Sequence, residues 1–202
     1  MNVMGIALVF TGYFSLALEL LLIPVPSQVS AVQLVKQENT FKTRTRALWS
    51  LRWFLPVMIN IATFAVPPIV AGISLTNGGG RPLIDNIGLT LSAAILIVLG
   101  RVVTIWAALA MRAGEQLSLL EGTLSTAFHQ AGPFRWSRNP GLLGMYLFAV
   151  GLILLIPNVG LALGFGFYGW HMHQRVLMEE RGLQARFGTT YQKYCGNTRR
   201  YV

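Results

Sequence analysis

Residues 132–141 read Gly-Pro-Phe-Arg-Trp-Ser-Arg-Asn-Pro-Gly, and about thirty mainly apolar residues follow them. A second charged block begins at Arg175 and runs to Tyr194. A polar block before a membrane hairpin and another after it return to the same side of the bilayer. The two blocks therefore predict one shared site at the membrane surface.

The composition of the chain is that of a membrane protein. Of its 202 residues, 53% are hydrophobic and only 11% are charged, whereas a soluble domain carries roughly 25% charged residues. The net charge of +9 comes from basic residues at the ends of apolar runs. This pattern favours the positive-inside rule over nucleic-acid binding. The single cysteine, Cys195, excludes an internal disulfide framework.

Five apolar segments predict an all-α integral membrane protein with about five transmembrane helices. A helical crossing needs about 20 apolar residues, so the last two segments are short and predict a tight hairpin that is tilted or thins the bilayer. The first segment lacks the features of a cleaved signal peptide, so we expect a retained helix. The segments are 2–23, 51–75, 87–109, 142–156 and 159–170.

The charge of the loops predicts the orientation. Loop 24–52 carries five basic residues and one acid, and the chain after Trp170 carries six basic residues and two acids. Basic loops stay in the cytoplasm. We therefore expect a multi-pass protein with its N-terminus outside and its C-terminus inside. We expect one membrane domain, 1–202, with a three-helix part at 1–110.

The two polar blocks contain a linked set of motifs. As a set they resemble the C-terminal signature of the isoprenylcysteine carboxyl methyltransferase family, which includes related phospholipid methyltransferases. Arg175 also matches an arginine of the carboxyl methyltransferases, while Asn139 and Leu142 stand where the family has histidine and tyrosine. The matching residues are Gly132-Pro133-Phe134, Arg138-Asn139-Pro140, Gly144, Glu179-Glu180, Leu183, Phe187-Gly188, Tyr191 and Tyr194.

The resemblance implies that residues 111–202 form a methyltransferase-like part. S-adenosylmethionine is then bound in a cytoplasm-facing pocket, which a C-terminal helix closes, and a lipophilic acceptor arrives from the bilayer. The residues that the resemblance assigns to the cofactor are Gly132, Phe134, Arg138, Asn139, Pro140, Glu179 and Glu180.

The residue types suit such a cofactor. Phe134 and Trp136 offer aromatic faces to adenine or to the sulfonium cation. Backbone N–H groups after Pro140, where a helix begins, suit the cofactor carboxylate. Glu180 suits the ammonium or the ribose hydroxyls. Tyr191 and Tyr194 are expected to dock the tail by packing.

Arg175 and Glu180 are the predicted catalytic residues. Methyl transfer needs mainly the alignment of acceptor, methyl group and sulfur. A carboxylate acceptor, such as that of an isoprenylcysteine-like molecule, needs only orientation, which Arg175 provides bidentately. An amine or thiol acceptor needs a base, for which Glu180 is the candidate. The alternative for Arg175 is an i,i+4 surface salt bridge with Glu179.

Two ionisable residues, Glu19 and Arg101, lie inside apolar segments. Such residues usually face the protein interior and are often paired. One hypothesis is that they form a polar wall beside the acceptor entrance. The alternative is that each side chain extends separately to the membrane interface.

Two other classes of function stay open. Residues 139–144, Asn-Pro-Gly-Leu-Leu-Gly, are similar to a stretch of membrane sterol reductases, which use NADPH. A non-enzymatic membrane scaffold also explains the apolar segments but not the motifs. We expect no metal, because His171 and His173 face different sides of a helix. We expect membrane lipid as a partner, and neither nucleic acid nor an obligatory protein partner.

Overall fold

The computed structural model describes residues 3–22, 46–76, 86–120 and 130–201. All regular elements within these ranges are helices, as the sequence predicts. Most of the basic loop 24–52 lies outside the described residues. The elements are α1 (Val3–Leu22), α3 (Arg46–Thr76), α4 (Ile87–Leu120), the 3₁₀ helix η1 (Gly132–Arg135), α5 (Pro140–Leu155) and α6 (Val159–Asn197).

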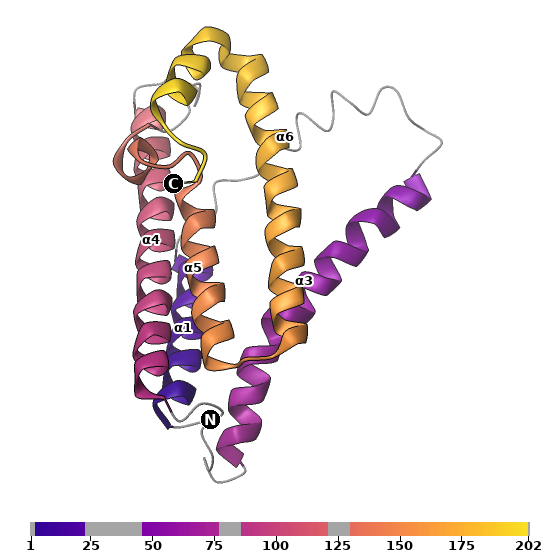
Figure 1. The fold of residues 1–202 in the computed structure, drawn as a ribbon. Coiled ribbons are helices and arrows are strands. Elements are labelled where there is room, and N and C mark those ends of the chain that lie inside the picture. The colour runs from indigo at the N-terminus through magenta and orange to yellow at the C-terminus, as the bar shows by residue number, and fades with distance from the viewer. Residues whose placement is uncertain (1–2, 23–45, 77–85, 121–129, 202) are drawn as a thin grey trace.

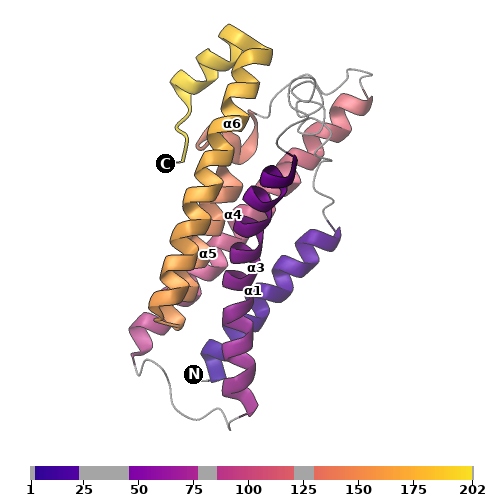
Figure 2. The ribbon, with the colours of Figure 1, turned by 90° about the vertical axis from the view of Figure 1, so that its right-hand side faces the viewer.

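The long helices form a bundle with one oblique member. Helices α1, α4 and α5 lie side by side, and α6 returns beside α5 in the opposite direction (Figure 1). Helix α3 crosses α6 and diverges from the bundle towards its own N-terminal end (Figures 1 and 2). The apolar segment 159–170 and the polar helix that follows it are therefore one continuous helix, α6, as far as a kink at Gly188.

The backbones of α4 and α5 approach each other closely. A Cβ atom on Gly100 would lie 2.6 Å from the carbonyl oxygen of Gly144, and one on Gly144 would lie 2.6 Å from that of Gly100. Gly151 meets Ala93 and Ile97 in the same way, two turns further along α5. Small residues that let helix backbones approach this closely are typical of membrane helices.

Apolar residues fill the centre of the bundle and also cover its outside. Val9 of α1 and Phe148 and Leu152 of α5 are fully buried. On the outside, Val102 of α4 is 55% exposed and Phe14 of α1 is 65% exposed. Broad apolar surface of this kind indicates contact with lipid or with a partner.

Among the described residues, one helical stretch is both long and apolar enough to cross a membrane, Ile87–Ala113. Three shorter apolar stretches accompany it, Val3–Glu19, Met58–Ser74 and Pro140–Leu155. The described residues thus confirm a helical architecture with an apolar helix of spanning length.

A glycine reverses the chain at its C-terminal end. Gly188 has φ 51° and ψ −121°, a conformation that is essentially restricted to glycine. Residues 189–201, here called the tail, therefore fold back over the end of the bundle (Figure 1). There Ser137 and Arg199 form a parallel β-bridge, and the Arg138 N–H donates to the Arg199 carbonyl at 2.8 Å.

We predict that Gly188→Ala destabilises the docked tail by about 1–3 kcal/mol, because a side chain makes this backbone conformation unfavourable. A Cβ at this position meets no atom within 4 Å, so the cost is conformational and not steric. Gly196→Ala is the matched control, since Gly196 also has open space but no positive φ. Limited proteolysis of the tail measures the effect. Equal protection in both variants would contradict the prediction.

Candidate active site

The first wall of the site is the turn between η1 and α5. Gly132 has φ 60°, and Pro133 is buried within η1. Pro140 occupies the first turn of α5, where its missing N–H costs nothing and its fixed φ suits a helix. The Ser137 hydroxyl accepts from the Asn139 N–H at 3.1 Å. This rigid turn fixes Arg138 and Asn139 at the start of α5.

The tail forms the second wall. The carbonyl of Arg200 accepts from the Ser137 hydroxyl at 3.3 Å and from the Asn139 side-chain amide at 3.2 Å. Asn139, which stands where the family has histidine, thus uses its amide as a donor to hold the tail. These bonds and the adjacent β-bridge bring the Arg200 side chain to α6.

Glu180 of α6 lies between two arginines. Arg200 donates from Nε to both carboxylate oxygens at 3.1 Å and from Nη2 to Oε2 at 2.8 Å. Arg138 Nη1 lies 3.3 Å from Oε1. The side chains of Arg138 and Glu180 are each 14% exposed. The hydrogen bond to Glu180 raises the pKa of Arg200, so this cluster of Arg138, Glu180 and Arg200 carries one net positive charge.

Arg138 has donor capacity that the described residues do not use. Its Nη1 also donates to Cys195 Sγ at 2.7 Å, but its Nε is buried and has no partner in the described part of the chain. Buried polar groups are nearly always hydrogen-bonded, so such an exception points to a bound group. The site is therefore suited to a ligand with an acceptor oxygen next to Arg138.

Two tyrosines of the tail are buried, as expected for packing residues. Tyr191 is 3% exposed and Tyr194 is 9% exposed. The Tyr194 hydroxyl donates to the Phe134 carbonyl at 2.7 Å. Burial raises the pKa of Tyr194 to about 12, so its hydroxyl keeps its proton at neutral pH and continues to donate.

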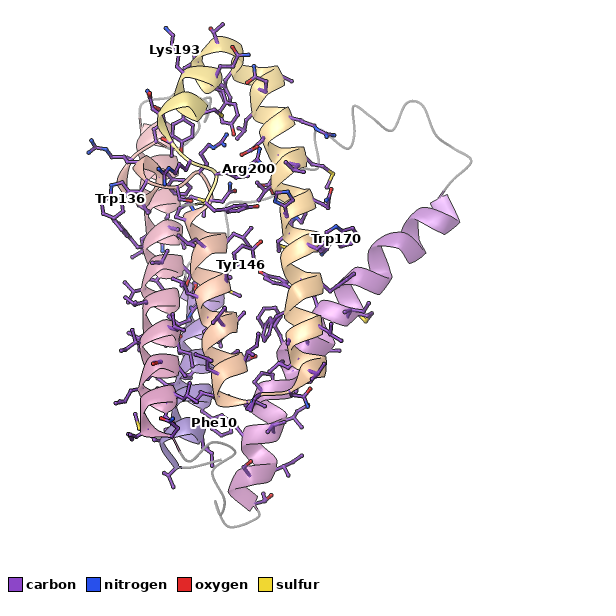
Figure 3. The ribbon with its side chains drawn as sticks, in the orientation of Figure 1. Phe10, Trp136, Tyr146, Trp170, Lys193 and Arg200 are labelled. Carbon is purple, nitrogen blue, oxygen red and sulfur yellow. The ribbon has the colours of Figure 1, made fainter. Side chains whose placement is uncertain are left out.

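Three residues near the cluster were not predicted from the sequence. His173 lies seven residues before Glu180, two turns along the same face of α6. Its Nδ1 lies 2.8 Å from the Tyr201 hydroxyl, and the Tyr201 ring meets Tyr146 of α5 with centroids 6.1 Å apart. Figure 3 shows Tyr146 between α5 and α6, below Arg200. The seven-residue spacing was the one sequence signal for His173.

Several predicted residues lie apart from the cluster. Arg175 and Glu179 form an i,i+4 pair at 3.7 Å, and their side chains are 43% and 63% exposed. Their surface salt bridge is therefore present, and their catalytic and cofactor roles stay predictions. Trp136 is 73% exposed and packs edge-on against Trp106, so its ring lies on the outer surface. Figure 3 shows it directed away from the bundle.

Glu19 and Arg101 form an ion pair between α1 and α4. Arg101 Nε donates to the Ser15 hydroxyl at 2.8 Å, and Nη1 donates to the Thr104 hydroxyl at 3.0 Å. Its guanidinium also lies 5.9 Å from the centre of the Phe148 ring. Arg101 is buried, so the alternative of separate extension to the interface is wrong. The role of the pair at an acceptor entrance stays a prediction.

One comparison with known proteins gives a family match. The sequence model of the phospholipid methyltransferase family matches residues 89–190, just over half of the chain. The matched region runs from α4 to the tail and includes Arg138 and Glu180. The protein thus belongs to a class of membrane-associated methyltransferases, and its family is the phospholipid methyltransferase family. No curated protein and no solved structure matches the chain.

We predict that Glu19→Gln and Arg101→Gln each destabilise the bundle by about 3 kcal/mol, because each leaves the other, largely buried charge without its partner. The double variant should lose less stability than the sum of the losses in the two single variants, since the two groups interact directly. Thermal unfolding of the four proteins in detergent measures this coupling. Additive losses would show that the pair contributes nothing as a pair.

Proposed function

We propose that the protein is an S-adenosylmethionine-dependent methyltransferase that acts on a lipophilic acceptor at the cytoplasmic face of a membrane. The cluster of Arg138, Glu180 and Arg200, inside a chain of the phospholipid methyltransferase family, carries the proposal. Arg138 and Glu180 of this cluster belong to the two motifs that are linked in such enzymes. Their ion pair explains why the motifs occur together.

The residues of the cluster fit the amino-acid end of the cofactor. That end carries a carboxylate and an ammonium group, and the cluster offers guanidinium donors beside a carboxylate. The unpartnered Nε of Arg138 suits an acceptor oxygen, as charge-assisted hydrogen bonds to carboxylates are strong. Backbone N–H groups of the first turn of α5 add donors at the positive end of the helix. When bound, the cofactor supplies a methyl group on a sulfonium that a nucleophile takes directly.

The residues of the chain would position this cofactor and exclude water. The Asn139 side chain donates to the carbonyl of Arg200 in the tail. Tyr194 of the tail donates to the carbonyl of Phe134 in η1, so both bonds hold the tail in place. The tail in turn places Arg200 against Glu180. Docking of the tail therefore completes the cluster, so cofactor binding and tail docking should depend on each other.

The surroundings of Glu180 bear on the acceptor. Both of its oxygens accept from guanidinium groups, which suits a holding role better than proton removal. A carboxylate acceptor of the isoprenylcysteine type needs no base, so it stays the favoured acceptor, with Arg175 as its orienting residue. An amine or thiol acceptor needs a proton acceptor. In that case His173, beside Tyr201, is a better candidate than Glu180.

The topology is also a proposal. Helices α1, α3, α4, α5 and the first half of α6 would be the five crossings, with the N-terminus outside and the site in the cytoplasm. The exposed apolar residues of α1, α3 and α4 support lipid contact on these helices. In this five-span arrangement, α5 and the first half of α6 would be the membrane hairpin next to the site.

The two other classes predict different ligands. A reductase of the sterol-reductase type binds NADPH, and a scaffold binds neither cofactor. The family match favours the methyltransferase. A ligand that binds only the folded state raises the unfolding temperature. Thermal unfolding with S-adenosylmethionine, S-adenosylhomocysteine or NADPH therefore separates the three, and stabilisation by NADPH alone would reject our proposal.

We predict that Glu180→Ala weakens S-adenosylmethionine binding about tenfold to a hundredfold, because one buried charge-assisted hydrogen bond contributes about 1.5–3 kcal/mol. Glu179→Ala removes the same charge one residue away. The Glu179 carboxylate is 63% exposed and pairs with Arg175, so a much smaller change here would assign the cofactor contact to Glu180 and not to Glu179. Calorimetric dissociation constants provide the comparison. An unchanged constant in Glu180→Ala would remove Glu180 from the site.

A further inference from the structure

A polar cavity lies between the tail and the residues around η1. Its volume is about 460 Å³. It is bounded by the turn before α5 on one side and by the tail on the other. The residues that line it are Gln130, Arg135, Thr190, Lys193, Tyr194, Asn197 and Thr198. Arg138, Glu180 and Arg200 are not among them, so this cavity is separate from the cluster proposed for the cofactor.

The charge of the cavity is positive. Arg135 of η1 and Lys193 of the tail both line it, and no carboxylate is among its described lining residues. Neither side chain has an ion pair with another described residue. A cationic sulfonium cofactor would be repelled here, whereas an anion would meet two cations. Arginine and lysine together with hydroxyl and amide donors are the usual ligands of phosphate.

The cavity also lies near aromatic residues of the kind found at membrane surfaces. Trp136 follows Arg135 directly and is 73% exposed, and Trp106 of α4, which it contacts, is 41% exposed. Figure 3 shows Trp136 on the side of the bundle and Lys193 at its end. Exposed tryptophans mark the level of the lipid headgroups. Arg135, at the edge of the cavity, is therefore next in sequence to a residue suited to the level of the lipid headgroups.

We propose that this cavity binds the phosphate of an anionic phospholipid, with Arg135 and Lys193 as its two charged ligands. The site is distinct from the acceptor and cofactor sites of the proposed function. Because one ligand residue belongs to η1 and the other to the tail, a bound lipid holds the tail against the turn. It thereby adds to the bond that Tyr194 makes to Phe134.

The experiment uses the full chain in phosphatidylcholine nanodiscs, to which phosphatidylglycerol is added in steps, without cofactor. Phosphatidylglycerol should raise the unfolding temperature in a saturable way. Arg135→Gln and Lys193→Gln should each need about fivefold more of this lipid for half of the effect, which corresponds to about 1 kcal/mol per basic residue. Arg181→Gln is the matched control, an exposed cation of α6 outside the cavity.

The outcomes are distinct. A fivefold shift in both cavity variants, with Arg181→Gln like the wild type, supports the lipid site. A second outcome is that inorganic phosphate, added to nanodiscs of pure phosphatidylcholine, stabilises the wild type but not Arg135→Gln. This result supports a phosphate site whose ligand is soluble and not a lipid. Equal responses of all variants, or no response of the wild type, would overturn the proposal. Neither result depends on S-adenosylmethionine binding, so the two proposals fail separately.

Discussion

The carboxylate of Glu180 joins three parts of the chain that are far apart in sequence. It pairs with Arg138 at the start of α5 and with Arg200 in the tail, while Glu180 itself is in α6. A largely buried glutamate is unfavourable without such partners, and two arginines close together repel each other without it. The closed position of the tail therefore depends on this cluster, and so does the candidate site that the tail completes.

The cluster in turn depends on how α5 is placed. The backbones of α4 and α5 meet at Gly100 and Gly144. Gly144 lies about one helical turn into α5, close to the segment before α5 that carries Arg138. A larger residue at either position would push α5 away and move Arg138 from Glu180. The ion pair of Glu19 and Arg101 adds α1 to the same region of α4. Apolar packing and two polar clusters thus act together to fix the site.

The sequence predicted the parts of the site that local motifs determine. Arg138 and Glu180 belong to linked motifs on either side of an apolar hairpin, and their contact follows from the return of the chain. The apolar surroundings of Glu19 and Arg101 also predicted that these residues face the protein interior as a pair. Arg200 and Tyr201 were missed, because their position depends on the reversal at Gly188. A glycine shows that an unusual backbone angle is allowed, but not which way the chain then runs.

The central proposal is that the unpartnered Nε of Arg138 receives the carboxylate of the cofactor. Calorimetry with S-adenosylmethionine and with its decarboxylated analogue tests it most directly, since the two ligands differ only in that group. Loss of one charge-assisted hydrogen bond to a buried partner weakens binding by about 1.5–3 kcal/mol. The account predicts that the analogue binds about tenfold to a hundredfold more weakly. Equal affinity for the two ligands would contradict it.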